Sequence, residues 1–133
     1  MEEGFPRLTP YIVVHNAKEA IEFYQKAFNA TVVNVMPDEE SGKIMNAQLK
    51  FGDSMLMLND EFPDFGALGA KALGANPTTF HLSCDDVDAE FQQAVDAGCE
   101  VKMPLEDMFW GDRYGQLEDP YGYKWSMGAP IKQ

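Results

Sequence analysis

The chain has little positive charge, and this shortage limits the partners it can have. Its 133 residues include 10 lysines and arginines but 22 acidic residues, which gives a net charge of −12. A chain this acidic is repelled by nucleic acid backbones and by anionic lipid head groups. It also lacks an apolar run of ~20 residues and a basic, apolar leader, so no segment is expected to cross a membrane. We therefore expect a cytoplasmic protein with neither nucleic acid nor a membrane as partner.

Cysteine and histidine are scarce as well. The only cysteines, Cys84 and Cys99, are too few for a disulfide framework and lack the C-x-x-C spacing of zinc and redox sites. We expect both to be buried as small hydrophobes. His15 stands at the end of an apolar run, where a loop is expected, and this leaves His81 as the one histidine available to a site. A site with two histidine ligands is thereby excluded.

Two motifs with strong chemical meaning are missing from the sequence. It has no glycine-rich loop of the kind that holds a nucleotide and no G-x-S-x-G motif, so nucleotide-dependent and serine-hydrolase functions are set aside. What the chain does have is 45% hydrophobic and 12% aromatic residues, at a length typical of one domain. We expect a single domain over residues 1–133.

Apolar periodicity in each half of the chain predicts one strand, one helix and three further strands. In the first half the predicted elements are strands at 8–14, 31–35, 44–51 and 54–58 and a helix that begins after the N-cap Asn16. In the second half they are strands at 78–84, 99–103, 108–117 and 123–127 and a helix between the N-cap Asp86 and Gly98.

A shift of 70 residues brings the two halves into correspondence. It places Thr9 on Thr79 and Asn16 on Asp86. The sequence therefore predicts an α+β fold of two tandem βαβββ modules, the first over 5–60 and the second over 78–128, with a linker over 60–77. Because neither half has enough core to stand alone, we expect the two sheets to curve into one open barrel around a central cleft.

Five motifs carry a family resemblance. A-I-E-F-Y-Q-K-A-F at 20–28, D-D-V-D at 85–88 and E-D-P-Y-G-Y-K-W at 118–125 resemble the vicinal-oxygen-chelate superfamily of glyoxalases, bleomycin-resistance proteins and dioxygenases. F-W-G-D-R-Y-G at 109–115 and M-L-M-L-N-D-E-F-P at 55–63 resemble its PhnB-like branch. The resemblance covers nearly the whole chain, and it implies a homodimer.

Metal-dependent members of that superfamily place a ligand on the first strand and a glutamate on the last strand of each module. Carried onto this chain, those positions fall at Thr9 and Thr79, and at Ser126 and Leu56, or Met57 if the register shifts by one. Zinc, nickel and iron bind imidazole, thiolate or carboxylate groups, which none of these residues supplies. We therefore expect neither a metal nor a cofactor.

His81 is the best catalytic candidate. It lies two residues after Thr79, so both side chains point to the same face of the predicted strand. Imidazole exchanges a proton near neutral pH, so His81 could act as a general base or bind an anion. The alternative is a structural hydrogen bond to a neighbouring strand. Tyr11 is the repeat equivalent of His81 and could line the opposite wall of the same pocket.

The PhnB-like motif holds the densest group of polar and aromatic side chains. Arg113 could bind an anion there by two parallel hydrogen bonds. Alternatively, Asp112 and Arg113 pair or pin the strand, while Trp110 packs in the core or at a dimer interface. Strand alternation places Trp110 and Tyr114 on one face and Arg113 on the other, unless a bulge at Gly111 redirects them.

The sequence favours a protein that binds a small, partly apolar or anionic molecule in the cleft without a metal. One alternative is a metal-dependent lyase, isomerase or dioxygenase of the glyoxalase type, in which His81 and a non-standard shell hold the metal. Another is a structural or regulatory homodimer with an interface at Trp110. The residues expected at the ligand are Thr9, Tyr11, Leu56, Thr79, His81, Trp110, Arg113 and Ser126.

Overall fold

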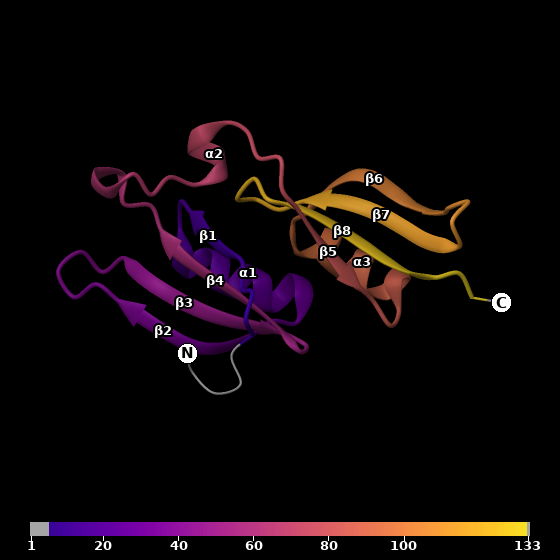
Figure 1. Cartoon of the computed structure of the whole chain (residues 1–133), viewed down its shortest axis with the longest axis horizontal. Helices are drawn as coiled ribbons and strands as arrows, with labels where there is room; N and C mark the ends of the chain where they lie inside the picture. Colours follow the sequence, from indigo (N-terminus) through magenta and orange to yellow (C-terminus); the bar gives the residue numbers. More distant parts are fainter. Residues whose placement is uncertain (1–5, 133) are drawn as a thin grey trace.

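Two βαβββ modules follow one another along the chain, as the sequence predicts (Figure 1). The computed structural model describes residues 6–132, so the ends of the expected domain lie outside the described residues. The first module consists of β1 (Tyr11–Val14), α1 (Ala17–Phe28), β2 (Thr31–Pro37), β3 (Ile44–Phe51) and β4 (Ser54–Asp60). The second consists of β5 (Thr79–Ser83), α3 (Val87–Ala97), β6 (Glu100–Asp107), β7 (Asp112–Glu118) and β8 (Lys124–Pro130).

Each module forms its own four-stranded sheet with the same strand order. The orders are β1-β4-β3-β2 and β5-β8-β7-β6, and in both sheets the first strand lies parallel to the last. A register shift falls at the same place in each outer hairpin, between Val32 and Asn34 in the first sheet and between Val101 and Met103 in the second. Two modules that repeat even an irregularity of this kind share one backbone design.

The two long helices begin where the sequence predicts, because polar side chains cap their first turns. The Asn16 side chain accepts a hydrogen bond from the Glu19 N–H at 3.2 Å, and the Asp86 carboxylate accepts one from the Ala89 N–H at 3.3 Å. These caps fix the helix starts and turn the apolar stripes toward the sheets. Among residues 6–132, no helix combines the length and apolar character needed to cross a membrane.

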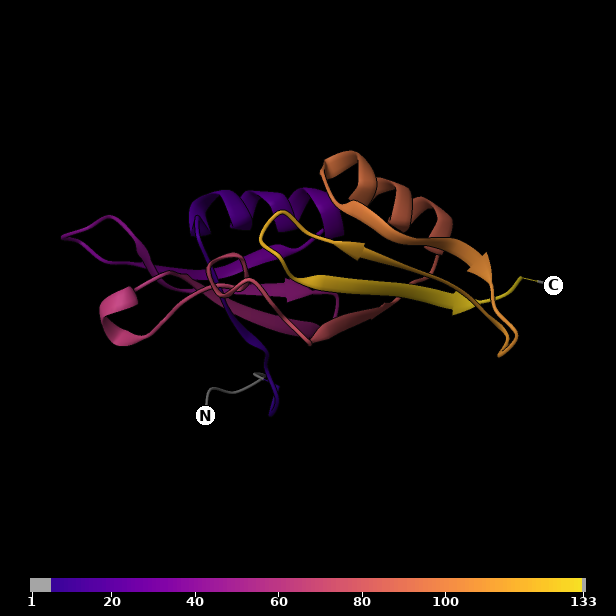
Figure 2. The same cartoon turned by 90° about the horizontal axis from the view of Figure 1, so that it is seen from above.

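Both helices lie on the same side of the two sheets. Figure 2 shows α1 and α3 next to each other above the strands, and neither helix covers the opposite side. We call the sheet surfaces turned away from these helices the open faces. Side chains of β1 alternate between the helix-covered core and the open face. For example, Ile12 and Val14 are buried whereas Tyr11 is 48% exposed.

Aromatic packing joins the modules. Within residues 6–132, no strand of the first sheet pairs with a strand of the second, so the sheets form an open arrangement and not a closed barrel. The Trp125 ring of the second module lies 5.8 Å from the Tyr24 ring, centroid to centroid, and 4.5 Å from the Phe28 ring. Phe51, also from the first module, stacks on the same indole at 5.6 Å.

The carboxylate of Asp119, which is only 2% exposed, binds the two modules together. It accepts hydrogen bonds from the Tyr24 hydroxyl of the first module at 2.5 Å and from the Trp125 indole at 2.9 Å. The backbone N–H groups of Tyr121 and Tyr123 donate to its other oxygen at 2.9 Å each. Burial raises the pKa of Asp119, and these hydrogen bonds oppose that rise. The side chain is a structural acceptor at the module seam.

Several strand boundaries differ from those predicted, and β6 for example extends to Asp107, beyond the predicted end at residue 103. The first strand begins at Tyr11, after Pro10, which has no N–H to donate to a ladder. The predicted strand at 108–117 begins only at Asp112, because residues 108–111 form the hairpin turn, with Gly111 at φ +100°. The linker contains η1 (Pro63–Phe65) and α2 (Ala70–Leu73), which are too short to give a periodic signal.

Candidate functional site

The open face of the second sheet carries a group of polar side chains around His81. Its Nδ1 lies 2.8 Å from the Ser126 hydroxyl, and Ser126 is paired across the sheet with Gln116. The Gln116 amide donates to the Tyr114 hydroxyl at 3.1 Å, and the Tyr114 ring stacks 6.0 Å from the imidazole. Gly128 lies between these rings, where a Cβ would come within 3.3 Å of the His81 ring. An imidazole, a hydroxyl, a carboxamide and a phenol are thus gathered on one surface. We call these four residues, His81, Ser126, Gln116 and Tyr114, the His81 row.

The open face of the first sheet repeats this row with different chemistry. Tyr11 takes the place of His81, pairs with Met57, and Met57 pairs in turn with Gln48. The Asn46 amide donates to the Tyr11 hydroxyl at 3.0 Å and lies 3.7 Å from the Met57 sulfur. The first open face therefore offers a phenol, a thioether and carboxamides, but no imidazole.

The strand register decides which residue of β4 corresponds to Ser126. Tyr11 lies opposite Met57 just as His81 lies opposite Ser126, so the last strands of the modules are related by a shift of 69 residues. Met57 therefore occupies the position equivalent to Ser126. Leu56 is 4% exposed and packs in the core under α1.

The side chains at the family's metal positions do not fit a metal ion. Those positions hold Thr9 and Met57 in the first module and Thr79 and Ser126 in the second. Hydroxyl and thioether groups supply neither the charge nor the basicity that zinc, nickel or iron requires. In the described part of the chain, no three His, Cys, Asp or Glu side chains gather into a potential metal site. No catalytic step through a metal follows from these residues.

A cavity of about 360 Å³ lies at the seam of the modules, beside β5. Three of the residues expected at the ligand line it: Leu56, Thr79 and His81. Its apolar and aromatic walls come from both modules and include Leu8, Phe51, Met55, Phe80, Leu82 and Trp125. A few polar groups in a mainly apolar cavity of this size are typical of small-molecule sites.

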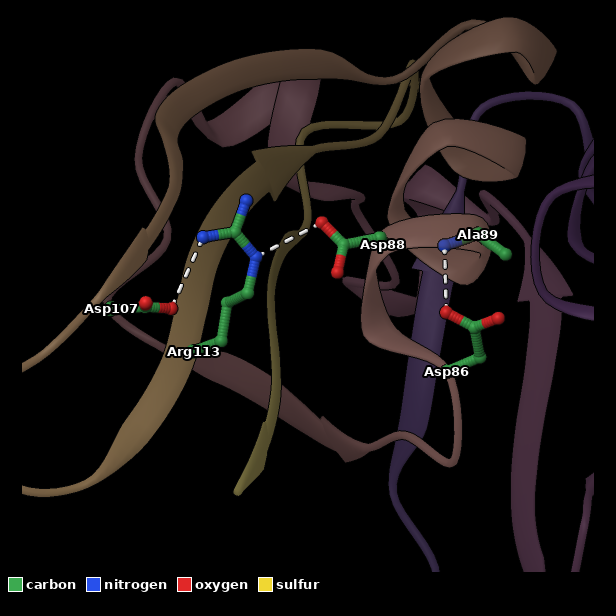
Figure 3. A network of polar contacts seen from close by, with 5 residues as sticks. All are labelled: Asp86, Asp88, Ala89, Asp107 and Arg113. Atoms are coloured by element: carbon green, nitrogen blue, oxygen red, sulfur yellow. Dashed lines mark hydrogen bonds and ion pairs between the residues drawn. The ribbon is translucent and has the colours of Figure 1, made fainter. Parts of the chain in front are cut away.

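Arg113 points away from the His81 row and is engaged by acidic partners. Its Nε donates to Asp88 at 2.9 Å and its Nη1 to Asp107 at 3.2 Å, as Figure 3 shows. Both bonds raise the pKa of the guanidinium. Arg113 therefore links α3 to the β6–β7 hairpin. The expectation that Asp112 is its ion-pair partner is wrong.

Trp110 lies in the β6–β7 turn, 51% exposed, beside the His81 row. Its ring contacts Tyr114 edge-on at 5.7 Å, on the opposite side of the hairpin from the Arg113 bonds. Neighbouring Phe109 is 99% exposed. Three of the eight residues expected at the ligand, His81, Ser126 and Trp110, thus lie around Tyr114. Tyr11, also expected there, lies on the other sheet.

Sequence reasoning missed Gln116 and Gln48 as members of the site. Both lie on the third strand of their module, opposite Ser126 and Met57. A comparison of those strands at a shift of 68 would have revealed two glutamines in equivalent positions. The signal was hidden because the shift changes from 70 to 68 across the bulged hairpin.

The chain is built from two tandem βαβββ units, and a cavity lined by residues of both units lies at their seam. The sequence model of the Glyoxalase/Bleomycin resistance protein/Dioxygenase superfamily matches residues 5–127, and the chain belongs to this superfamily.

Three similar proteins extend this comparison. An uncharacterized protein of Mycobacterium bovis is 43% identical over 131 residues, covering 96% of this chain and 86% of that protein. Protein PA1353 from Pseudomonas aeruginosa superimposes with a TM-score of 0.77 at 26% identity, covering 96% of this chain and 99% of that one. A Bacillus cereus protein described as a putative 3-demethylubiquinone-9 3-methyltransferase, PhnB protein, has the same fold, with a TM-score of 0.72 at 18% identity over 93% of this chain and 99% of that one.

Proposed function

We propose that this chain is a PhnB-like, cytoplasmic member of the superfamily that binds a small, partly apolar molecule without a metal. The cavity at the module seam is the observation that carries the proposal. It is walled by aromatic and aliphatic side chains from both modules, and Thr79 and His81 give it a polar edge. Such a lining favours an apolar body with one polar group.

His81 is the side chain we expect to orient the ligand. Its Nδ1 is occupied by Ser126, which holds the imidazole in place, and the ring lies at the wall of the cavity. A ring fixed by one nitrogen can present the other to a ligand as donor or acceptor.

Titration with the neutral, apolar dye N-phenylnaphthylamine tests this proposal. We expect its fluorescence to rise saturably at one dye per chain. Met55→Trp places an indole in the cavity and is expected to weaken binding about tenfold or more, whereas Phe65→Trp, at an exposed position outside the cavity, leaves it unchanged. Equal binding by both variants, or no saturable binding by the unmodified chain, would rule out the seam cavity as the site.

We also propose a homodimer that covers the exposed edge strand β2. β2 is an edge strand without a charged residue, and Val32, Val33 and Met36 are 40%, 52% and 51% exposed on it. Long apolar edges of this kind are usually covered in solution. Light scattering after size-exclusion chromatography is expected to give twice the chain mass of 14.9 kDa. A mass of one chain at micromolar concentration would contradict the dimer.

A metal-dependent lyase, isomerase or dioxygenase of the glyoxalase type is the second candidate. It is favoured by one observation, that His81 lies directly opposite Ser126, the position where metal-dependent members carry a glutamate. Metal analysis of protein purified without chelator separates the candidates. Stoichiometric zinc, nickel, iron or manganese that is lost in His81→Ala would support the enzyme and overturn metal-free binding.

A further inference from the structure

Arg113, the cation that the sequence offered for an anionic ligand group, is held in ion pairs with Asp88 and Asp107. We infer that Lys71 and Lys124 form an anion subsite beside the β7–β8 turn, at the end of the open face of the second sheet. There they bind a phosphate or carboxylate group of the bound molecule. This inference rests on the proposed function for the identity of the full ligand, but the subsite itself can be tested alone.

The two lysines line one cavity of about 630 Å³ between the linker and the β7–β8 turn. Lys71 comes from α2 and Lys124 from the start of β8. In the described part of the chain, neither ammonium group has a carboxylate within 4.0 Å. In a protein with 22 acidic and 10 basic residues, two such cations at one cavity are a local exception to the overall charge.

Glu118 is the one carboxylate among the residues that line this cavity, so the charge there remains positive. It pairs across the sheet with Lys124 without forming an ion pair. Glu118 therefore weakens an anion site without neutralising it, and its removal should strengthen anion binding.

The cavity adjoins the His81 row on the same open face. Lys124 is paired with Thr79, and Ser126 with His81, so the two pairs lie two residues apart along the same strands. Two residues of a strand span roughly 7 Å, and side chains at this spacing point to the same face. Thr79 also lines the seam cavity. A molecule whose apolar part occupies the seam cavity can therefore extend its charged group past Thr79 to the lysines.

Asn76 provides a second indication at the same cavity. Its side-chain oxygen accepts a hydrogen bond from the Thr78 N–H at 3.0 Å, whereas its Nδ2 is buried and has no hydrogen-bond partner among the described residues. A buried amide donor without an acceptor costs stability. Asn76 lines the same cavity as the two lysines, so its unpaired amide is a further polar group at the proposed subsite.

Heteronuclear NMR titration with inorganic phosphate, at constant ionic strength, tests the subsite, with sodium acetate as a second arm. We expect saturable shifts at amides of residues 71–77 and 118–124. Lys71→Gln/Lys124→Gln should weaken phosphate binding about fivefold to tenfold. Lys18→Gln/Lys26→Gln, on exposed positions of α1, changes the net charge equally and should leave the affinity within about twofold.

Glu118→Gln should strengthen phosphate binding about threefold. Equal weakening by the two lysine double variants, shifts outside these residues, or no saturable shift with either anion would overturn the subsite. These outcomes are separate from the dye titration. Phosphate binding with no binding of N-phenylnaphthylamine would leave the subsite standing and contradict the proposed function, and the reverse result would contradict the subsite alone.

Discussion

The two modules share a backbone but fill the space beneath their helices differently. Ala47 of β3 and Gly115 of β7 are equivalent, since they pair with equivalent residues of β4 and β8. The corresponding helix residues are Ile21 in α1 and Phe91 in α3. A Cβ on Gly115 would come within 2.8 Å of the Phe91 ring. The larger helix side chain is thus accommodated by the loss of a strand Cβ, as close packing requires.

The modules differ most where they carry structural and functional polar groups. In the first, Asp60 accepts hydrogen bonds from the Ala17 and Ile44 N–H groups at 2.7 Å each and ties α1 to its sheet. In the second, Arg113 performs this task, and Asp119 bonds the whole module to the first. The two modules thus share one pattern of strand pairing. They differ in the side chains that tie the helix to the sheet and in those on the open faces.

The largest effect is expected from Asp119→Ala. It leaves the Tyr24 hydroxyl, the Trp125 indole and two backbone N–H groups without their buried acceptor. We expect the free energy of unfolding to fall by about 3–5 kcal/mol. Urea denaturation measures it, with Tyr24→Phe as a control that removes only one of the four donors and costs about 1 kcal/mol. A loss no larger than that of the control would contradict the role of Asp119 as the bond between modules.

Gly115→Ala tests the exchange of volume between strand and helix. The added methyl group is held between the Phe91 ring and the Met103 carbonyl oxygen, which lies 3.0 Å from the Cβ position. We expect a loss of about 1–3 kcal/mol. Phe91→Ile introduces the isoleucine found at the equivalent position of α1, Ile21. The double variant Gly115→Ala/Phe91→Ile should therefore recover part of the stability lost in Gly115→Ala. Strict additivity in a double-mutant cycle would show that the two positions do not compensate each other.

Asp60→Ala removes the anchor of the first module. The Ala17 and Ile44 N–H groups lose their acceptor, and the expected loss is about 1–2 kcal/mol. Urea denaturation should place this variant between Asp119→Ala and the unmodified chain. A loss as large as that of Asp119→Ala would reverse the order in which we rank the two anchors.

Arg113→Gln should have the smallest effect on stability. Its ion pairs with Asp88 and Asp107 are at the surface, so solvent and salt screen them. We expect a loss smaller than that of Asp60→Ala, and one that disappears in about 1 M NaCl. A loss that does not depend on salt would show that Arg113 stabilises the module by packing.

Thiol labelling tests burial in the second module without any substitution in the chain. Burial raises the pKa of Cys84 and of Cys99 to about 12, and both cysteines belong to this module. Unfolded thiols titrate near 8.5, so the stability linked to the neutral thiols is lost as pH rises from about 9 toward 12. At pH 8 we expect a disulfide reagent to label the native chain far more slowly than the chain in urea. Equally fast labelling in both conditions would contradict burial.

The sequence was sufficient to predict the duplicated modules, because caps such as Asn16 and Asp86 act locally. It could not predict the partners of Arg113, since Asp88 and Asp107 approach it only through tertiary packing. The choice between Leu56 and Met57 also depended on the register of β1 with β4, which turn lengths and bulges determine. The lysine cavity involves a linker without periodicity, so no sequence pattern pointed to it.

Heteronuclear NMR with N-phenylnaphthylamine is the most direct test of the central claim, that both modules build one ligand site at their seam. The cavity is lined by residues 53–56 of the first module and 79–82 of the second. Our account predicts that amides of both segments shift together and saturate at one dye per chain. Shifts confined to one module, or centred on the outer surfaces of α1 and α3, would contradict it.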